Sequence, residues 1–267
     1  MTRRVWLAGV LAAAGLTMTV AAAPQPVGVT KQTWQVSGVA RTALVASPTA
    51  PVPAAGSPLV LVFHGHGGTS AHSARTYAIH THWPEAVVIY AQGLPTPGKL
   101  SDPEGVKPGW QHTPGTEGDR DLKFTDEMIK WARARYRIDP ARIFAAGHSN
   151  GGTFTYVLWA ARADVFAAFA PSASVFRKEL IASAKPKPAL VILGEKDQLV
   201  PVAAQRLSLE ATLRLDQASR SGEAWSGRYV TLHKSSIGAT VVTYIHPGDH
   251  TMPDDAGQMM AKFFKQF

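Results

Sequence analysis

Residues 147–151 read Gly-His-Ser-Asn-Gly and match the G-x-S-x-G pattern, which places a reactive serine on a sharp turn between a strand and a helix. A short apolar run at residues 142–146 comes directly before the pattern, and a helical pattern at residues 152–162 comes directly after it. Glycine fits the closely packed flanks of such a turn because it has no Cβ atom. The context therefore predicts Ser149 as the nucleophile of covalent catalysis; the alternative is a serine that only caps a helix in a glycine-rich turn.

A serine hydroxyl is a weak nucleophile near neutral pH, so Ser149 requires a histidine base and an acid that orients this base. With this type of turn the three residues follow one another along the chain in the order Ser, Asp, His. Asp197 follows the apolar run at residues 189–193, and His250 follows the run at residues 240–245. We therefore predict a catalytic triad of Ser149, Asp197 and His250.

Two other carboxylates lie close to the predicted triad in sequence. Glu195 immediately follows Gly194, and this position in the motif makes it the second choice for the acid. Asp249 is the direct neighbour of His250. Because the side chains of adjacent residues diverge, Asp249 is a poor orienting partner for this histidine.

The turn after the apolar run at residues 59–63 supplies the donors that an acyl-transfer reaction needs for its oxyanion. Residues 63–68 read Phe-His-Gly-His-Gly-Gly, a stretch related to the His-Gly-Gly-Gly motif of such turns. We predict that the backbone amides of His66 and Asn150 form the oxyanion hole. Gly67 would take the place of His66 if the turn is shifted by one residue.

His64 is predicted to hold this turn through hydrogen bonds of its side chain. A metal site is the alternative, since His64 and His66 match half of the H-x-H-x-D-H pattern of metallo-hydrolases. Gly68 and Thr69 stand where that pattern requires Asp and His. We therefore predict no metal ion.

Short apolar runs alternate with helical patterns along the chain. The runs lie at residues 59–63, 86–90, 142–146, 189–193 and 240–245, and the helical patterns at residues 71–80, 121–136, 150–162, 203–215 and 254–267. Runs this short and continuous fit strands that are buried on both faces of a parallel sheet. The alternation predicts a mostly parallel, doubly wound sheet with helices on both faces, and the serine motif makes this α/β domain an α/β-hydrolase fold.

The chain divides into three predicted segments. Residues 1–22 form a signal peptide, residues 23–57 a leader with edge strands, and residues 58–267 the catalytic domain. Within this domain, residues 219–236 interrupt the alternation of strands and helices. They are predicted to be a surface insertion, and a lid is the alternative.

Two further groups have structural interpretations. Asp119 and Asp121 begin a helical pattern and are predicted to complement the helix dipole. Apolar side chains at helical spacing near the end of the sequence predict packing of the last helix on the core: Met259, Met260, Phe263, Phe264 and Phe267.

The first residues follow the pattern of an export signal. Arg3 and Arg4 precede an apolar stretch at residues 5–20, and alanines fill residues 21–23. The apolar stretch is short for a membrane span, and an uncleaved anchor is the alternative. Cleavage after Ala22 would release a periplasmic or secreted protein with no stable membrane anchor.

Composition excludes several classes of protein and site. The chain has 267 residues, of which 45% are hydrophobic and 17% charged, so a sizeable core is available and a mainly disordered chain is excluded. The absence of cysteine excludes disulfides, thiolate metal sites and cysteine nucleophiles. The formal charge is +8, but the basic residues do not form one run, so no nucleic-acid partner is predicted.

Six stretches together resemble a known group of enzymes. They are F-H-G-H-G-G from Phe63, Y-A-Q-G-L from Tyr90, G-W-Q from Gly109, R-I-D-P-A-R-I-F-A-A-G-H-S-N-G-G from Arg137, L-G-E-K-D-Q-L-V-P from Leu193 and G-D-H-T-M-P from Gly248. With them, residues 57–267 resemble the secreted esterases of the polyhydroxybutyrate depolymerase and feruloyl or acetylxylan esterase group, in carbohydrate esterase family 1. The resemblance implies an acyl-enzyme ester hydrolase without a cofactor, with Ser149, Asp197 and His250 as its triad.

The same resemblance bears on the substrate. G-W-Q lies in a long loop at residues 92–118, and the resemblance implies that Trp110 and His112 line the substrate pocket, with surface packing as the alternative. Three features differ from the group: the absence of disulfides, Met252 in place of the usual tryptophan after His-Thr, and the absence of a polymer-binding module after Phe267.

We therefore expect a serine carboxylic ester hydrolase that acts on hydroxyalkanoate oligomers or on feruloyl or acetyl esters. Its partner would be a small-molecule or oligomeric ester. The last stretch also resembles phospholipase/carboxylesterase and peptidase-like serine hydrolases, which stay as alternatives because the same triad attacks amides. A binding protein on an inactive hydrolase fold would be expected to lack the nucleophile, base, acid or oxyanion loop, and all four are present.

Overall fold

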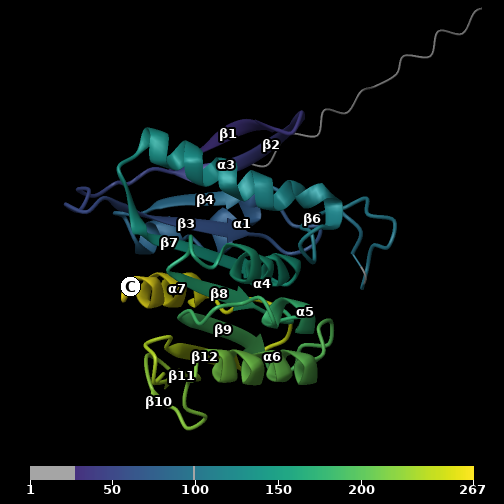
Figure 1. The fold of residues 1–267 in the computed structure, drawn as a ribbon, viewed down its shortest axis with the longest axis vertical. Coiled ribbons are helices and arrows are strands. Elements are labelled where there is room, and N and C mark those ends of the chain that lie inside the picture. Colours follow the sequence, from purple (N-terminus) through teal and green to yellow (C-terminus); the bar gives the residue numbers. More distant parts are fainter. Residues whose placement is uncertain (1–27, 99) are drawn as a thin grey trace, which may run out of the picture.

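The computed structural model describes residues 28–98 and 100–267. In this part of the chain a ten-stranded sheet has the order β1-β2-β4-β3-β7-β8-β9-β12-β11-β10, and helices cover both of its faces (Figure 1). The predicted signal peptide lies outside the described residues. The prediction of a mostly parallel sheet between two helical layers is confirmed.

The six central strands of the sheet run parallel to one another. In spatial order they are β4 (Val87–Ala91), β3 (Ser57–Phe63), β7 (Ile138–His148), β8 (Ala168–Ser172), β9 (Ala189–Gly194) and β12 (Val241–His246). Strands β3, β4, β8 and β9 are buried along their whole length, which is why their sequences are apolar or small without alternation. The loops that follow these strands meet at the carboxyl end of the sheet, where α/β sheets bind their ligands.

Antiparallel strands close both edges of the sheet. β1 (Val29–Val36) and β2 (Val39–Ala46) form a hairpin whose turn residues, Ser37 and Gly38, both have positive φ, as a tight hairpin turn requires. At the other edge lie β11 (Val230–His233) and β10 (Glu223–Ala224). Residues 219–236 are therefore neither a lid nor a simple insertion. They extend the sheet because Val230 packs in its core.

Two layers of helices cover the sheet. On one face lie α3 (Arg120–Arg135), α4 (Asn150–Arg162), the short α5 (Lys178–Ile181) and α6 (Val202–Leu215); on the other lie α1 (Ser70–Thr76), α2 (Ile79–His82) and α7 (Ala256–Phe264). The predicted packing residues of α7 are buried, and Phe267 packs against them. Among the described residues no helix is long and apolar enough to cross a membrane.

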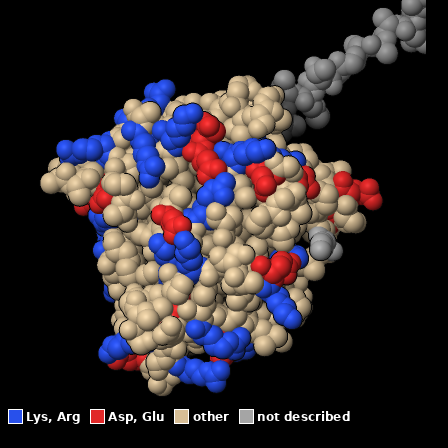
Figure 2. All heavy atoms as spheres, viewed as in Figure 1, with Lys and Arg blue, Asp and Glu red and all other residues tan. Residues whose placement is uncertain are grey.

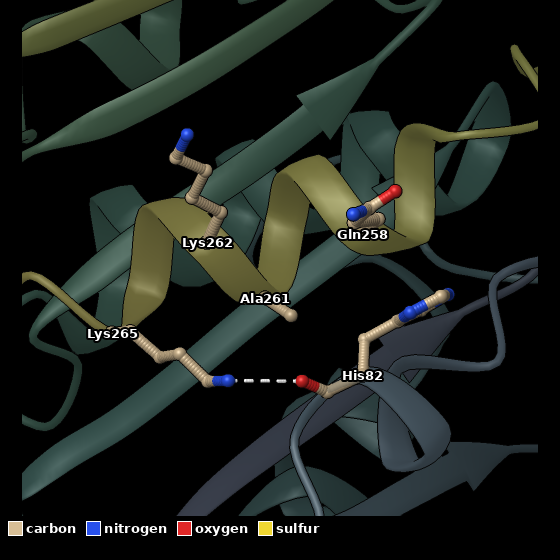
Figure 3. A pocket seen from close by; sticks show the side chains of 5 residues that line it. All are labelled: His82, Gln258, Ala261, Lys262 and Lys265. Carbon is tan, nitrogen blue, oxygen red and sulfur yellow. Dashed lines mark hydrogen bonds between the residues drawn. The ribbon is translucent and has the colours of Figure 1, made fainter. Parts of the chain in front are cut away.

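Two elements differ from the sequence prediction. Strand β8 has the sequence Ala-Phe-Ala-Pro-Ser, whose alanine and proline residues favour strands weakly, and it forms because β7 and β9 pair with it on both sides. The helix predicted at residues 71–80 is divided into α1 and α2 by Ala78, which has a left-handed conformation with φ of 41°. Lys265, directly after α7, donates a hydrogen bond of 2.9 Å to the His82 carbonyl at the end of α2 (Figure 3).

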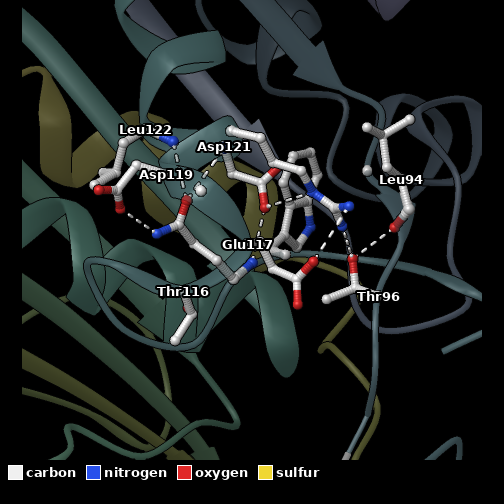
Figure 4. Close-up of polar contacts among 12 residues, drawn as sticks. Leu94, Thr96, Thr116, Glu117, Asp119, Asp121 and Leu122 are labelled. Atoms are coloured by element: carbon white, nitrogen blue, oxygen red, sulfur yellow. Dashed lines mark hydrogen bonds and ion pairs between the residues drawn. The ribbon is translucent and has the colours of Figure 1, made fainter. Parts of the chain in front are cut away.

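The start of α3 contains a buried ion pair that connects three parts of the chain. Asp121 is fully buried and accepts hydrogen bonds from the Arg41 guanidinium of β2 at 2.7 Å and from the Gln111 amide at 2.8 Å. Gln111 in turn accepts from the first amides of α3 and donates to Asp119 (Figure 4). The prediction that Asp121 only complements the helix dipole is therefore too limited, because this carboxylate is the counter-ion of a buried arginine.

Replacing Asp121 with asparagine should lower the free energy of unfolding by about 3–5 kcal/mol, because Arg41 would then be buried without a counter-charge. Urea denaturation of the two proteins measures this difference. Asp119→Asn is the matched control, since this carboxylate is partly exposed and bonds to neutral donors only. Equal losses in the two variants would contradict the assignment of Asp121.

Candidate active site

Ser149 lies on the sharp turn that the sequence predicts, between β7 and α4. Its backbone has φ of 56° and ψ of −119°, an uncommon conformation for a residue with a side chain. A Cβ atom on Gly147 would clash with the Gly151 carbonyl, and one on Gly151 would clash with the Phe63 carbonyl. Both glycines of the motif are therefore required for the close contact of this turn with α4 and β3.

The structure brings the three predicted triad residues together. The Ser149 Oγ lies 2.9 Å from the Nε2 of His250, and the Nδ1 of His250 lies 2.8 Å from the Oδ2 of Asp197. The carboxylate accepts the Nδ1 proton, which leaves the Nε2 lone pair for the serine proton. The order of donors and acceptors is that of a histidine base held by an acid.

Asp197 is buried and fully hydrogen-bonded. Its Oδ1 accepts from the amides of Leu199 and Val200, and its Oδ2 also accepts from the Gln205 side chain at 2.8 Å. Burial acts to raise the pKa of Asp197, but the hydrogen bonds from His250 and Val200 outweigh it and hold the pKa below its ordinary value. The acid therefore stays ionised beside the histidine.

The two competing carboxylates lie elsewhere. Glu195 forms an exposed ion pair with Arg206 at 3.3 Å. Asp249 accepts hydrogen bonds from the amide and hydroxyl of Thr251. Neither carboxylate is the hydrogen-bond partner of His250 in the structure.

The loop after β3 lies directly beside the nucleophile. A Cβ atom on Gly65 would be 3.4 Å from the Cβ of Ser149. Within residues 28–98 and 100–267, the backbone amides of His66 and Asn150 have no protein acceptor, whereas the Gly67 amide donates to the Pro108 carbonyl at 2.7 Å. The amides of His66 and Asn150 are thus the ones available to an oxyanion, and Gly67 is not an equivalent substitute.

His64 holds this loop from inside the protein. Its Nε2 accepts the Gly93 amide at 2.9 Å, and its Nδ1 donates to the Gly65 carbonyl at 2.7 Å. Burial lowers the pKa of His64 from 6.5 to about 4. Because both ring nitrogens of His64 already form hydrogen bonds, the structural role is favoured over the alternative of a metal ligand.

The low pKa of His64 predicts a loss of stability in mild acid. Between pH 6.5 and 4 the unfolded chain binds a proton at this residue and the native state does not, so stability falls as pH falls through this range. The contribution is about 3 kcal/mol and is fully present above pH 6.5. Urea denaturation at pH 7.5 and pH 4.5 measures it.

Two variants separate His64 from the other groups that titrate in acid. In His64→Gln the stability at pH 7.5 should be lower, but the decrease toward pH 4.5 should be smaller than in the wild type. His72→Gln, which replaces an exposed histidine nearby, should keep the wild-type pH dependence. The same slope in wild type and His64→Gln would contradict the prediction.

The side chain of His66 joins the oxyanion loop to the long loop at residues 92–118. Its Nε2 lies 3.0 Å from the Oδ2 of Asp102, and both side chains are largely buried. Asp102 also accepts the amides of Val106 and Lys107. The position of the His66 amide therefore depends on a carboxylate in a separate loop.

Trp110 does not line the substrate cavity, contrary to the sequence prediction. Its side chain is fully buried, and its indole N–H donates to the His64 carbonyl at 2.8 Å. Its backbone amide and carbonyl bond to the side chain of Asn150 at 2.7 and 3.1 Å. The residue fixes the two oxyanion donors relative to each other because it bonds to both of the segments that carry them.

A cavity of about 600 Å³ surrounds Ser149 and His250 at the carboxyl end of the sheet. His112 lines it, as predicted, together with His66 and Asn150. The apolar lining residues are Tyr77, Leu100, Val175, Leu199, Val200 and Pro201. This volume suits a small-molecule substrate or a short segment of a larger one.

A second, smaller hollow lies between α2 and α7 (Figure 3). Its volume is about 280 Å³, and its lining residues are His82, Gln258, Ala261, Lys262 and Lys265. None of these five residues is a hydroxyl or thiol nucleophile. The hollow between α2 and α7 therefore lacks the nucleophile that the cavity at Ser149 has.

Comparison with known proteins gives a partial match to one family and to two individual proteins. The profile of the prolyl oligopeptidase family (Peptidase_S9) matches residues 111–185, which include the serine turn. The chain is 31% identical over 165 residues to NocK of Nocardia uniformis subsp. tsuyamanensis, a protein named as an esterase, with 59% of this chain and 45% of NocK covered. It is 38% identical over 96 residues to feruloyl esterase B of Piromyces equi, with 34% and 18% covered. The chain thus spans less than half of the length of these two relatives.

A solved structure matches over most of the chain. The acetyl xylan esterase from Aspergillus awamori superposes with a TM-score of 0.62 and 14% sequence identity, over 88% of this chain and 99% of that one. The chain has the α/β-hydrolase fold. The order of the triad residues along the chain and their positions after β7, β9 and β12 are those of this fold.

Three residues support the triad and oxyanion hole of this α/β-hydrolase fold without appearing in the sequence prediction. Asp102 and Gln205 have no motif around them. Asp102 is 36 residues from its partner His66, and Gln205 is eight residues from its partner Asp197. His148 lies inside the serine motif but at its variable position. Only the folded chain shows what these side chains contact.

The ring of His148 packs against the ring of His250. Its ring lies 4.9 Å from the ring of His250, its Nδ1 is 3.2 Å from the Ser172 hydroxyl, and it also bonds to the His250 backbone. Burial, with the neighbouring His250 as a second cause, lowers the pKa of His148 to about 3. A neutral His148 therefore packs beside the catalytic histidine without repelling its charged form.

Together these groups can carry out nucleophilic acyl transfer. The serine hydroxyl, the histidine base and the buried carboxylate form one chain of hydrogen bonds, and the backbone amides of His66 and Asn150 have no acceptor among the described residues. In the described part of the chain no group of three His, Cys, Asp or Glu residues has the arrangement of a metal site.

Proposed function

We propose that this protein is a serine carboxylic ester hydrolase that acts through an acyl-enzyme. The observation that carries the proposal is the hydrogen-bonded chain from Ser149 through His250 to Asp197, at the edge of a cavity of about 600 Å³. A binding protein on this fold would have no need for the complete triad and the two available amides. The names of the sequence relatives and of the similar structure agree with an esterase.

The first half of the reaction acylates the serine. His250 takes the proton of Ser149 as its oxygen attacks the ester carbonyl, and the amides of His66 and Asn150 stabilise the oxyanion. The tetrahedral intermediate collapses when the carbon–oxygen bond to the alcohol breaks. His250 returns the proton to the leaving alcohol, which departs and leaves the acyl-serine.

The second half returns the free enzyme. Water occupies the position of the alcohol, gives a proton to His250 and attacks the acyl carbonyl. A second tetrahedral intermediate forms in the same oxyanion hole and releases the carboxylic acid, while the proton of His250 restores the Ser149 hydroxyl. Asp197 keeps its charge throughout and stabilises the imidazolium in both halves.

For the substrate we propose hydroxyalkanoate oligomers or accessible feruloyl or acetyl esters. Apolar side chains and histidines form most of the cavity wall, and the volume limits the bound portion to a small acyl group or short oligomer. Rates with p-nitrophenyl esters of increasing acyl length, methyl ferulate, acetylxylan and a hydroxybutyrate trimer test this proposal. Turnover of none of these esters by folded protein would contradict it.

We also propose that the protein is exported, with the segment after Ala22 located in the periplasm or outside the cell. The support is the order of arginines, apolar stretch and alanines at residues 1–23. N-terminal sequencing of protein recovered from the extracytoplasmic fraction should begin at Ala23. Full-length protein in the cytoplasm would contradict the proposal.

A second function, peptide hydrolysis, has one specific observation in its favour. The prolyl oligopeptidase family profile covers the serine turn and the elements on both sides of it. The same triad attacks amides, but an amide needs more stabilisation of its poorer leaving group. A p-nitroanilide and a p-nitrophenyl ester with the same acyl group distinguish the two functions, and the proposed esterase should prefer the ester.

A further inference from the structure

The cavity around Ser149 differs in charge from the outer surface of the protein. On the face shown in Figure 2, Lys and Arg side chains are interspersed with Asp and Glu side chains. In the cavity the basic lining residues are Arg177 and five histidines: His66, His72, His112, His148 and His250. No Asp or Glu is among the lining residues of the described chain, so the cavity has a fixed positive charge and no fixed negative one.

Two carboxylates bond to histidines of the cavity wall, and neither of them is an ion-pair partner of Arg177 among the described residues. Asp102 bonds to His66 and to amides of its own loop. Asp197 bonds to His250 from behind the cavity wall. Each carboxylate is therefore engaged with a partner other than the arginine.

Arg177 keeps most of its hydrogen-bonding capacity. Its ion-pair partner in the described chain is Glu179, at 3.7 Å, and this carboxylate is 59% exposed. Such a long and solvated pair is weak. The Arg177 side chain is 28% exposed and lines the cavity together with Val175, so its planar N–H groups can meet a ligand in partly desolvated surroundings.

The backbone that carries Arg177 is held in place on both sides. Ala173 donates to the Ile192 carbonyl of β9 at 2.9 Å, and the Phe176 amide donates to the Ser208 hydroxyl of α6 at 2.9 Å. The ring of Phe176 is buried and stacks on Tyr156 with a centroid distance of 4.2 Å. Arg177 thus lies on a fixed segment between β8 and α5, at the same carboxyl end of the sheet as Ser149 (Figure 1).

We propose that Arg177 is a carboxylate-binding residue of the substrate cavity, and that the preferred substrates are esters with a second, free carboxylate. Half-esters of dicarboxylic acids and hydroxyacid oligomers with a free terminal carboxylate have this chemistry. The inference rests on the proposed ester hydrolysis and makes its substrate class more specific. Among the proposed substrates it favours hydroxyalkanoate oligomers over feruloyl and acetyl esters of sugars.

A carboxylate fits this site better than a phosphate does. The planar guanidinium forms two parallel hydrogen bonds with a carboxylate, and one positive charge balances one negative charge. A phosphate dianion would bring a second negative charge into a cavity that has one fixed positive charge and several apolar lining side chains, among them Val200 and Pro201. Burying an uncompensated charge beside such side chains is unfavourable.

Two matched pairs of esters test the proposal on either side of the scissile bond. In the acyl group, p-nitrophenyl hydrogen adipate is compared with p-nitrophenyl hexanoate, which has the same chain length without the carboxylate. In the leaving group, the 3-hydroxybutyrate dimer is compared with its terminal primary amide. The quantity measured is kcat/KM for each ester with wild type, Arg177→Gln and Arg177→Lys.

In at least one pair, wild type should prefer the carboxylate ester, and Arg177→Gln should lower kcat/KM for that ester by about 10- to 100-fold while changing the neutral partner by less than about threefold. Arg177→Lys should retain part of the preference because it keeps the charge without the planar fork. Arg206→Gln is the control, since Arg206 is an ion-paired arginine that does not line the cavity. Added NaCl should raise KM for the carboxylate ester with wild type and have little effect with Arg177→Gln.

Two results would overturn the proposal, and they are distinguishable. Equal effects of Arg177→Gln on both members of each pair, or no effect on any, would exclude a carboxylate site while leaving the ester hydrolase intact. Failure of the folded wild-type protein to hydrolyse any of the four esters would contradict the proposed function, and the carboxylate site with it. The thermal midpoint of each variant confirms that the fold is retained.

Discussion

Replacing Ser149 with alanine should lower kcat for ester hydrolysis by about 10⁶-fold. The acyl-enzyme cannot form without the Oγ atom, and His250 then has no proton to accept. The oxyanion amides and the binding cavity remain, so a small residual rate above the uncatalysed reaction is expected. Steady-state kinetics with a p-nitrophenyl ester measure the loss.

The fold should be retained in Ser149→Ala. Alanine removes one oxygen atom and leaves the backbone turn, whose shape depends on Gly147 and Gly151. Ser101→Ala is the matched control, because this serine also lines the cavity but has no contact with His250 in the structure. A folded Ser149→Ala protein with substantial activity, or a loss of similar size in Ser101→Ala, would contradict the assignment of the nucleophile.

A fluorophosphonate probe gives a second readout that does not depend on choosing the right ester. The probe should label wild type at Ser149, as shown by mass spectrometry of the modified peptide, and should not label the alanine variant. Labelling of wild type without hydrolysis of any carboxylic ester would point to peptide hydrolysis, the second function considered for this triad. Labelling at another residue would contradict the nucleophile itself.

Features that depend on a continuous stretch of chain could be predicted from the sequence. The strand, turn and helix around Ser149 lie within one segment, and the positions of Asp197 and His250 follow from the apolar strands that precede them. Strands buried on both faces leave a clear apolar signal. The central strands other than β8, and the grouping of the three triad residues, could therefore be derived without knowledge of the three-dimensional contacts.

Features that depend on contacts between distant segments could not be predicted from the sequence. Trp110 lies in a glycine- and proline-rich loop that has no periodic pattern, so the sequence does not show that its ring packs between Phe63 and Phe154. Asp121 looks like an ordinary helix-start acid until Arg41, eighty residues earlier, is placed beside it. In each case a partner in another segment changes a surface residue into a buried one.

The sequence also predicts only part of what the structure shows for the acid of the triad. Sequence position favours Asp197 over Glu195 but does not reveal why its carboxylate stays ionised. The hydrogen bonds that hold it come from His250, from two amides of its own loop and from Gln205 in α6. The identity of the acid thus follows from the chain order, whereas its electrostatics follow from the fold.

Replacing Asp197 with asparagine should lower kcat by about 10⁴-fold with little change in KM. The asparagine amide can present an N–H to the Nδ1 of His250, which favours the tautomer that carries its proton on Nε2. The Nε2 lone pair is then lost to Ser149, and the charge that stabilises the imidazolium is also removed. Kinetics with the ester that wild type hydrolyses fastest measure the effect.

Glu195→Gln is the matched control for this variant, because it makes the same carboxylate-to-amide change two residues earlier in the same loop. Glu195 pairs with Arg206 at the surface, where both side chains are 49% exposed, so its loss should change kcat by less than about twofold. Both variants should unfold cooperatively, since each keeps the shape of the side chain. A larger loss of kcat in Glu195→Gln than in Asp197→Asn would show that the wrong carboxylate had been assigned to His250.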